Sequence, residues 1–312
     1  MPSHRTRIAI IGCGHVGTSC AYALLLNHLA SELILIDGTP DKARGEALDL
    51  QHAVPLGTPM KITAGTYKDA AASAIVIITV GIPGKFPGNR LDLLAGNAAL
   101  VRECIAKLMA ENFDGVLLLA TNPVDVLTCV AQTESGLPVG QVIGTGTLID
   151  TERLRFILGA YLNVDARSVH ASVIGEHGNS SVAVWSAAQV AGIPLALYPG
   201  ADGLPSRDEL LTSVRHAGPE VAALKGNTCY AIAACVARIC ESILRDERSV
   251  LVVSTQMTGQ YGLHHVSLST PCIVGNCGIE SVLELHLDPT EQNALEYSAS
   301  VLQQAASQVK AI

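Results

Sequence analysis

The chain has 312 residues, of which 49% are hydrophobic and only 15% are Asp, Glu, Lys or Arg. Its length exceeds what a single hydrophobic core usually fills, which favours two packed domains. A formal net charge of -8 without any run of Lys or Arg excludes nucleic acid and anionic membranes as expected partners, because neither would gain phosphate neutralisation from such a surface.

The cysteines and apolar segments bear on where the protein works. Nine cysteines, an odd number without CxxC spacing, predict buried reduced thiols and no disulfide framework. The apolar runs at 8–11, 75–80 and 116–120 are far shorter than the roughly 20 residues that cross a bilayer, and the start shows no signal-peptide pattern. We therefore expect a cytoplasmic protein. The surplus of apolar residues predicts a homo-oligomer, and the histidines show no grouping that predicts a metal site.

Short β-branched runs alternate with helical stretches in the first half of the chain. Strands are expected at 7–12, 32–38, 74–81, 115–121 and 141–146, and helices at 16–26, 40–51, 91–110 and after the turn at 122–126. This alternation is typical of parallel βαβ units. The sequence therefore predicts an α/β fold with a Rossmann-type doubly wound parallel sheet of roughly six strands.

The pattern changes beyond Thr147. A helix is expected at 150–162, a strand at 168–175, long helices within 208–245, and strands at 250–254 and 266–274. These elements predict a C-terminal mixed α/β domain. The chain is therefore divided into a first domain at 1–145 and a second at 146–312.

The first expected strand leads into a glycine-rich turn. Gly12, Gly14 and Gly17 form a GxGxxG pattern directly before a helix, where backbone N–H groups can approach a pyrophosphate closely. Asp37 ends the next strand, about 20 residues further on, where a carboxylate accepts hydrogen bonds from ribose hydroxyls and disfavours a 2′-phosphate. This context favours NAD over NADP. A glycine turn needed only for packing, beside an unrelated Asp, is the alternative.

A histidine and an Asp–Arg pair are candidates for chemistry. His177 follows an apolar strand and lies between glycines, so its imidazole can be presented to a cleft as a proton donor or acceptor. Asp150 and Arg153 are three residues apart on an expected helix and can share one face. The carboxylate can hold the imidazole while the guanidinium binds a substrate carboxylate. A structural histidine and a plain intrahelical ion pair are the alternatives.

A series of motifs resembles the L-lactate and L-malate dehydrogenases. They are GxGxxG with Asp37, the loop ending in PGNRLDL, and the segments TNPVDVLT, GTGTLIDTER, IGEHG and KGNT, and they occur in the family's order over nearly the whole chain. The segment HGNSSVAVWS and the C-terminal half are most similar to bacterial lactate dehydrogenases. The resemblance implies an NAD-dependent L-lactate dehydrogenase of pyruvate fermentation, with domain 1–145 binding NAD and domain 146–312 binding the substrate.

The resemblance also implies roles for single residues. It makes His177 the acid/base, Asp150 its orienting partner and Arg153 the anchor of the substrate carboxylate. Arg90 is the loop residue that closes on the substrate and polarises its carbonyl. The remaining implied positions contact the cofactor or line the substrate pocket, and they are Gly12, Gly14, Val16, Gly17, Asp37, Asn122, Thr228 and Ile232.

The chain departs from the family at the position that faces the variable end of the substrate. Lactate dehydrogenases carry Gln there and malate dehydrogenases Arg, whereas this chain has Gly84. Without an Arg, the second carboxylate of oxaloacetate has no guanidinium to bind it unless Lys85 turns inward. Without a Gln, the pocket is larger unless the side chain of Phe86 fills the space. A dehydrogenase of broader or bulkier L-2-hydroxy acids is therefore the first alternative, ahead of malate dehydrogenase. A non-catalytic NAD-binding sensor is the alternative from another class.

Two further positions suggest regulation. Arg155 and His170 match residues that bind fructose 1,6-bisphosphate across a subunit interface in the activated bacterial lactate dehydrogenases. Two cations from each of two subunits suit a bisphosphate. An ordinary helix-face Arg and a strand-start His are the alternative. The resemblance also implies a homotetramer.

Overall fold

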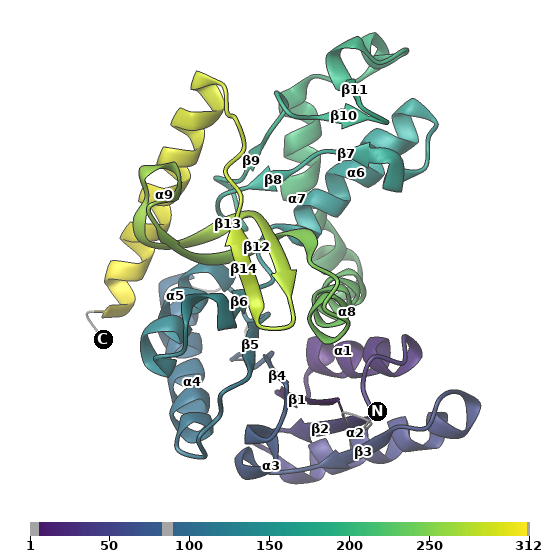
Figure 1. Cartoon of the computed structure of the whole chain (residues 1–312), viewed down its shortest axis with the longest axis vertical. Coiled ribbons are helices and arrows are strands. Elements are labelled where there is room, and N and C mark those ends of the chain that lie inside the picture. Colours follow the sequence, from purple (N-terminus) through teal and green to yellow (C-terminus); the bar gives the residue numbers. More distant parts are fainter. Residues whose placement is uncertain (1–5, 83–89, 311–312) are drawn as a thin grey trace.

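The computed structural model describes residues 6–82 and 90–310, and strands and helices alternate along its first half (Figure 1). The strands of the main sheet are β1 (Arg7–Ile11), β2 (Glu32–Ile36), β3 (Lys61–Ala64), β4 (Ile75–Ile78), β5 (Val116–Leu119), β6 (Val142–Gly144), β12 (Ser249–Thr258), β13 (His264–Gly275) and β14 (Gly278–Val282). The α-helices are α1 (His15–Leu26), α2 (Pro40–Ala53), α3 (Tyr67–Ala71), α4 (Arg90–Met109), α5 (Val124–Ser135), α6 (Leu148–Leu162), α7 (Arg207–Lys225), α8 (Tyr230–Leu244) and α9 (Pro289–Lys310). Short strands form two smaller sheets, one of β7 (Val169–His170), β10 (Gln189–Val190) and β11 (Ile193–Pro194), the other of β8 (Val173–Ile174) and β9 (Val182–Ala183).

The main sheet has a parallel part and an antiparallel part. Six strands pair in parallel in the order β3-β2-β1-β4-β5-β6. The strands β12, β13 and β14 continue the sheet antiparallel from β6. The parallel order is that of a doubly wound dinucleotide-binding sheet. The predicted Rossmann-type sheet with a mixed α/β C-terminal part is therefore confirmed.

Successive residues of the parallel strands point to opposite faces of the sheet, and each face has its own hydrophobic core. In β1, Ile8 and Ile10 enter the core beneath α1, α2 and α8, whereas Ala9 and Ile11 enter the core beneath α4, α5 and α9. All four side chains are buried. Burial on both faces explains why the central strands β4 and β5 are continuous apolar runs in the sequence.

The helices α5 and α6 begin where neighbouring parallel strands end. α5 starts at Val124, shortly after β5, and stops before Gly136, which has a left-handed conformation with φ 63°. α6 starts at Leu148, shortly after β6, and stops before Asn163, which is also left-handed. Because β5 and β6 are adjacent and parallel, the first turns of both helices lie at the same edge of the sheet.

One predicted strand is wrong. The strand expected at 168–175 is two short strands in different sheets, because β7 pairs with β10 whereas β8 pairs with β9. Both pieces are only two residues long, so the pattern does not reveal that their partners differ. The sequence pattern also does not indicate β3, β14 or α9. The sheet continues across the expected domain boundary at 145/146 through the pair Gly144 and Ser254, and that boundary remains a prediction.

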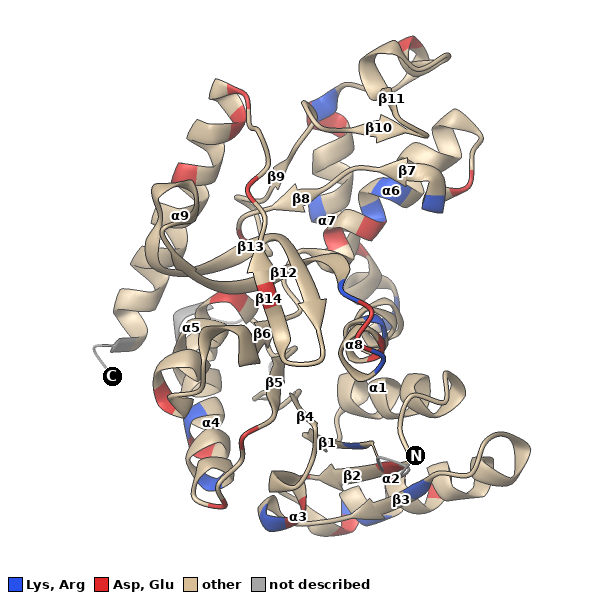
Figure 2. Ribbon diagram, viewed as in Figure 1, with Lys and Arg blue, Asp and Glu red and all other residues tan. Residues whose placement is uncertain are grey.

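Most charged residues lie outside the strands of the main sheet. Figure 2 shows Lys, Arg, Asp and Glu mainly on helices and loops, with both signs interspersed, while most strands carry few of them. Eight of the nine cysteines are buried and Cys277 is exposed. Across residues 6–82 and 90–310, no helix is both long and apolar enough to span a membrane.

Candidate active site

The glycine turn between β1 and α1 passes close to the end of β4. Gly12 has a φ of +108°, and a Cβ there would lie 2.8 Å from the backbone nitrogen of Val80. A Cβ on Gly17 would collide with the carbonyl oxygen of Gly12, so both positions require glycine. A Cβ on Gly14 would meet nothing within 4 Å. The space at Gly14 therefore leaves room for a ligand to approach the N-terminus of α1.

Asp37 follows β2 and lies beside this turn. Its Oδ2 accepts a hydrogen bond of 2.7 Å from the Cys13 backbone N–H, and its Oδ1 accepts one of 2.9 Å from the Thr39 backbone N–H. Each oxygen of a carboxylate has a second lone pair, so Asp37 can also accept hydrogen bonds from the hydroxyls of a ligand. The structure thus brings the glycine turn and Asp37 together, as the sequence pattern predicts.

Val16 and Ile232 lie on helices that pack against each other. Val16 is in the first turn of α1 and Ile232 in the first turn of α8, and both are partly buried against the same core. The pair places apolar surface next to the glycine turn. This position suits the cofactor contacts that the resemblance implies for them.

Asp150 holds two of the predicted catalytic side chains at once. Its Oδ2 lies 2.5 Å from Nδ1 of His177, and its Oδ1 accepts a hydrogen bond of 3.0 Å from Nη1 of Arg153. The Asp150 side chain is 6% exposed, whereas those of His177 and Arg153 are 24% and 20% exposed. Because the carboxylate holds Nδ1, Nε2 is the nitrogen of His177 that can exchange a proton with a ligand. The Asp–Arg pair is therefore part of a three-residue cluster.

The backbone on the N-terminal side of His177 is fixed by other segments. Gly175 exchanges two backbone hydrogen bonds with Ser269 of β13, at 2.8 and 3.0 Å. Its φ is +84°, and a Cβ there would lie 2.7 Å from the hydroxyl of Ser298 on α9, so the position requires glycine. The Glu176 N–H donates to the same hydroxyl at 2.8 Å. These contacts explain the glycine of the IGEHG segment that lies two residues before His177.

The surroundings of His177 raise its pKa above the ordinary value. Burial by itself lowers this pKa, because it disfavours the charged imidazolium. The negative charge of Asp150, the hydrogen bond to it and the charge of Asp125 outweigh burial, while Arg153 opposes them. These surroundings therefore favour the imidazolium, the form that can donate a proton to a ligand.

Two residues in this region were not singled out in the sequence. Asp125, on α5, is 2% exposed and accepts a hydrogen bond of 2.7 Å from the His177 backbone N–H. Asn97, on α4, accepts one from the Ile82 N–H and donates one to the carbonyl of Asn122, both at 2.8 Å. The sequence feature that could have marked Asp125 is a carboxylate in an otherwise apolar helical turn. Asn97 has no such signal.

Family models match both halves of the chain. The NAD binding domain of lactate/malate dehydrogenase matches residues 6–144, and the alpha/beta C-terminal domain of lactate/malate dehydrogenase matches residues 147–312. This chain belongs to the lactate/malate dehydrogenase family. The predicted resemblance and the NAD-binding fold are therefore confirmed.

Individual relatives of the lactate/malate dehydrogenase family are similar over nearly the full length. The L-lactate dehydrogenase of Priestia megaterium is 45% identical over 303 residues, which is 96% of this chain and 95% of that protein. The solved structure of the minor L-lactate dehydrogenase from Enterococcus mundtii matches with a TM-score of 0.94 and 38% identity, over 97% of this chain and 98% of the other. A lactate dehydrogenase from a Medee basin deep-sea metagenome matches with a TM-score of 0.94 and 36% identity, over 98% and 99% of the two chains.

The structure describes the other predicted substrate-binding positions only in part. Asn122 is exposed just beyond the end of β5, and Thr228 is partly buried in the turn between α7 and α8. Gly84 lies outside the described residues, as do Lys85 and Phe86. Arg90 is the first residue of α4, but its side chain is outside what the structure describes. The roles of Gly84 and Arg90 remain predictions.

Arg155 on α6 and His170 on β7 lie near each other. The Arg155 Nε donates a hydrogen bond of 2.8 Å to the carbonyl of Val169, the residue before His170. Its Nη1 also contacts Glu152 at 2.7 Å. The Arg155 side chain is 23% exposed and His170 is exposed. His170 is thus exposed, whereas Arg155 is partly buried and holds the backbone just before His170.

Proposed function

We propose that this chain is an NAD-dependent L-lactate dehydrogenase, which interconverts pyruvate and L-lactate with His177 as the acid/base. The observation that carries the proposal is the cluster in which Asp150 contacts both His177 and Arg153. A protein that only sensed NAD would need the glycine turn and Asp37 but not this cluster. The relatives named L-lactate dehydrogenase support the same reaction. A cytoplasmic location, expected from the sequence, is part of the proposal.

Each residue of the cluster has its own task. The Arg153 guanidinium binds the substrate carboxylate through parallel N–H donors. His177 donates a hydrogen bond from Nε2 to the 2-oxo oxygen and transfers its proton there as the oxygen gains charge. Asp150 stabilises the imidazolium before that transfer and keeps the ring oriented. In the opposite direction, neutral His177 accepts the hydroxyl proton of L-lactate.

The residues around the glycine turn fit the cofactor. Bound NADH supplies the hydride that reduces C2 of the 2-oxo acid. The open space at Gly14 admits a pyrophosphate to the N-terminus of α1, and Asp37 is placed to accept ribose hydroxyls. The Asp37 carboxylate would repel a 2′-phosphate, so it favours NAD over NADP.

Pyruvate is expected to have the highest kcat/KM among pyruvate, 2-oxoisocaproate, phenylpyruvate and oxaloacetate, measured by the loss of NADH absorbance. Oxaloacetate should be at least about tenfold poorer, because Gly84 provides no cation for a second carboxylate. If a bulkier acid has the highest value, the enzyme is a broader L-2-hydroxy-acid dehydrogenase. If the protein binds NADH but oxidises it with none of the four, it is a sensor and the proposed function is wrong.

We further propose that fructose 1,6-bisphosphate activates a homotetramer at Arg155 and His170. The support is their proximity, because the cations of two facing subunits would suit two phosphate groups. At subsaturating pyruvate, the bisphosphate should raise the rate about fivefold or more, and Arg155→Gln should abolish that response. An unchanged rate of the parent protein would remove the effector proposal. Sedimentation measures the number of subunits in the oligomer independently of the activation test.

A further inference from the structure

Two carboxylates contact His177 at different atoms. Asp150 contacts Nδ1 of the ring, whereas Asp125 accepts a hydrogen bond of 2.7 Å from the backbone N–H. Asp125 lies in the first turn of α5 and is 2% exposed. A buried carboxylate costs folding free energy unless partners compensate it, and the backbone N–H and the charge of His177 are among the groups that stabilise this one.

The second oxygen of Asp125 joins the same group to the start of α6. The Ser269 hydroxyl lies 3.5 Å from Oδ1 and accepts a hydrogen bond of 3.0 Å from the Thr147 N–H. The Thr147 hydroxyl donates at 2.5 Å to the carbonyl of Val173 on β8, which leads to His177. A continuous set of hydrogen bonds therefore connects α5, β13, the residue before α6 and the strand before His177.

We infer that Asp125 is a positioning residue for the acid/base, which fixes the main chain of His177 and places a second negative charge near its imidazolium. The inference rests on the proposed function and adds a residue to it. Asp150 fixes the ring and Asp125 the backbone, so the two carboxylates together define where Nε2 points. α5 also begins just after Asn122, so one helix start links a predicted substrate contact to the acid/base.

The charges around the two groups agree with this role. Burial raises the pKa of Asp125 to about 6. The Ser254 hydroxyl, the hydrogen bond from the His177 backbone and the charge of His177 act in the opposite direction, and the charge of Glu176 adds to the rise. Asp125 is therefore mostly ionised at neutral pH. Among the described residues, the charged groups that act on His177 are Asp150, Asp125 and Arg153, and the two carboxylates both favour its protonated form.

The substitution Asp125→Asn tests the charge, because the amide keeps the shape and an oxygen that can accept the His177 N–H. Loss of a nearby negative charge disfavours the imidazolium, so we expect the pKa of His177 to fall by about one unit. The titration is followed by NMR of protein labelled with carbon-13 at histidine Cε1, with His177→Gln to assign the signal. The alkaline limb of kcat/KM for pyruvate should move to lower pH by the same amount.

The substitution Asp125→Ala removes the backbone contact as well. We expect an additional loss of kcat of about tenfold or more, with little change in the Kd for NADH, because a displaced imidazole no longer meets the carbonyl oxygen correctly. If Asp125→Ala does not fold, Asp125→Asn decides the case.

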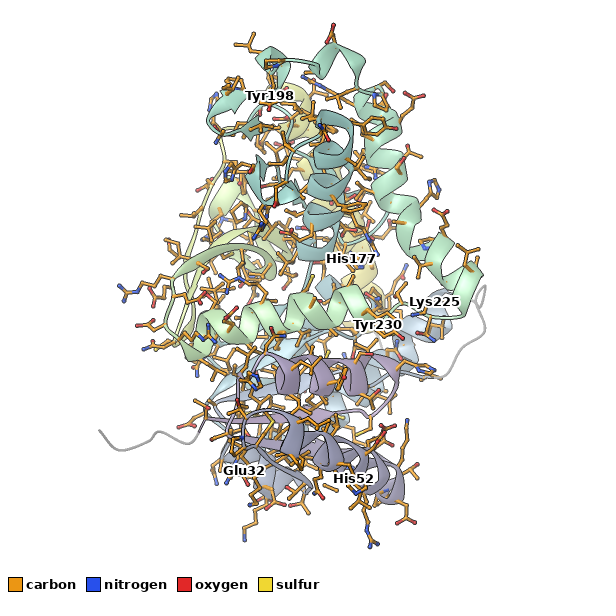
Figure 3. The ribbon with its side chains drawn as sticks, turned by 90° about the vertical axis from the view of Figure 1, so that its right-hand side faces the viewer. Glu32, His52, His177, Tyr198, Lys225 and Tyr230 are labelled. Atoms are coloured by element: carbon orange, nitrogen blue, oxygen red, sulfur yellow. The ribbon has the colours of Figure 1, made fainter. Side chains whose placement is uncertain are left out.

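Glu32→Gln is the matched control. Glu32 is also a buried carboxylate, 5% exposed, but it is paired with Arg7 and Lys61 and lies far from His177 (Figure 3). Its loss should lower stability without moving the pKa of His177. If Asp125→Asn leaves that pKa and the alkaline limb at the parent values, Asp125 is merely structural and the inference is wrong. Because the NMR titration needs no turnover, an inactive parent protein would refute the proposed function without deciding this test.

Discussion

Replacing His177 with glutamine is expected to lower kcat for pyruvate reduction about 10³-fold, because an amide cannot supply the proton that the carbonyl oxygen takes up. The Kd for NADH should stay near the parent value, since the glycine turn and Asp37 are untouched. Saturating pyruvate and NADH give kcat from the loss of NADH absorbance, and a fluorescence titration gives the Kd.

His52→Gln is the control for this substitution. His52 is exposed on α2, in a part of the molecule that Figure 3 shows well apart from His177. Its kcat should equal that of the parent. If His177→Gln is as active as His52→Gln, another group donates the proton, and the role that we assign to the Asp150 cluster has to be abandoned.

The parallel part of the fold and the glycine turn could be predicted because both depend on short segments. A strand buried on both faces is apolar throughout, as β4 is and as β1 is from Ile8 on, and the helix that follows such a strand is recognisable from its length. Gly12 and Gly17 are required by contacts of the turn with its immediate neighbours. Asp37 follows β2, the strand next to β1, so its place beside the turn follows from the order of the strands.

The parts of the site that the sequence does not predict depend on contacts between segments that are distant in the chain. Asp125 and His177 are 52 positions apart and meet through a backbone N–H, so the identity of residue 177 carries no sign of the contact. Asn97 connects Ile82 to Asn122 through backbone atoms in the same way. Side-chain chemistry marks His177, Asp150 and Arg153 as candidates, whereas the groups that hold their main chain in place have no distinctive pattern.

Arg153→Lys is expected to lower kcat/KM for pyruvate about 10²-fold, or about 3 kcal/mol, mainly through KM. Lysine keeps the positive charge but replaces the planar pair of donors with a single ammonium, which cannot bind both oxygens of a carboxylate in parallel. Initial rates over a range of pyruvate concentrations at saturating NADH separate KM from kcat.

The preserved charge makes this substitution informative about the whole cluster. Arg153 also contacts Asp150, so a lysine that stays near the carboxylate should leave the pKa of His177, and hence the alkaline limb of the pH profile, close to the parent value. Arg102→Lys, which alters an arginine paired with Glu134 on α4 and α5, should change neither KM nor the pH profile. A KM within about threefold of the parent for Arg153→Lys would mean that the substrate carboxylate binds elsewhere. A shifted pH profile with an unchanged KM would mean that Arg153 serves only to orient Asp150.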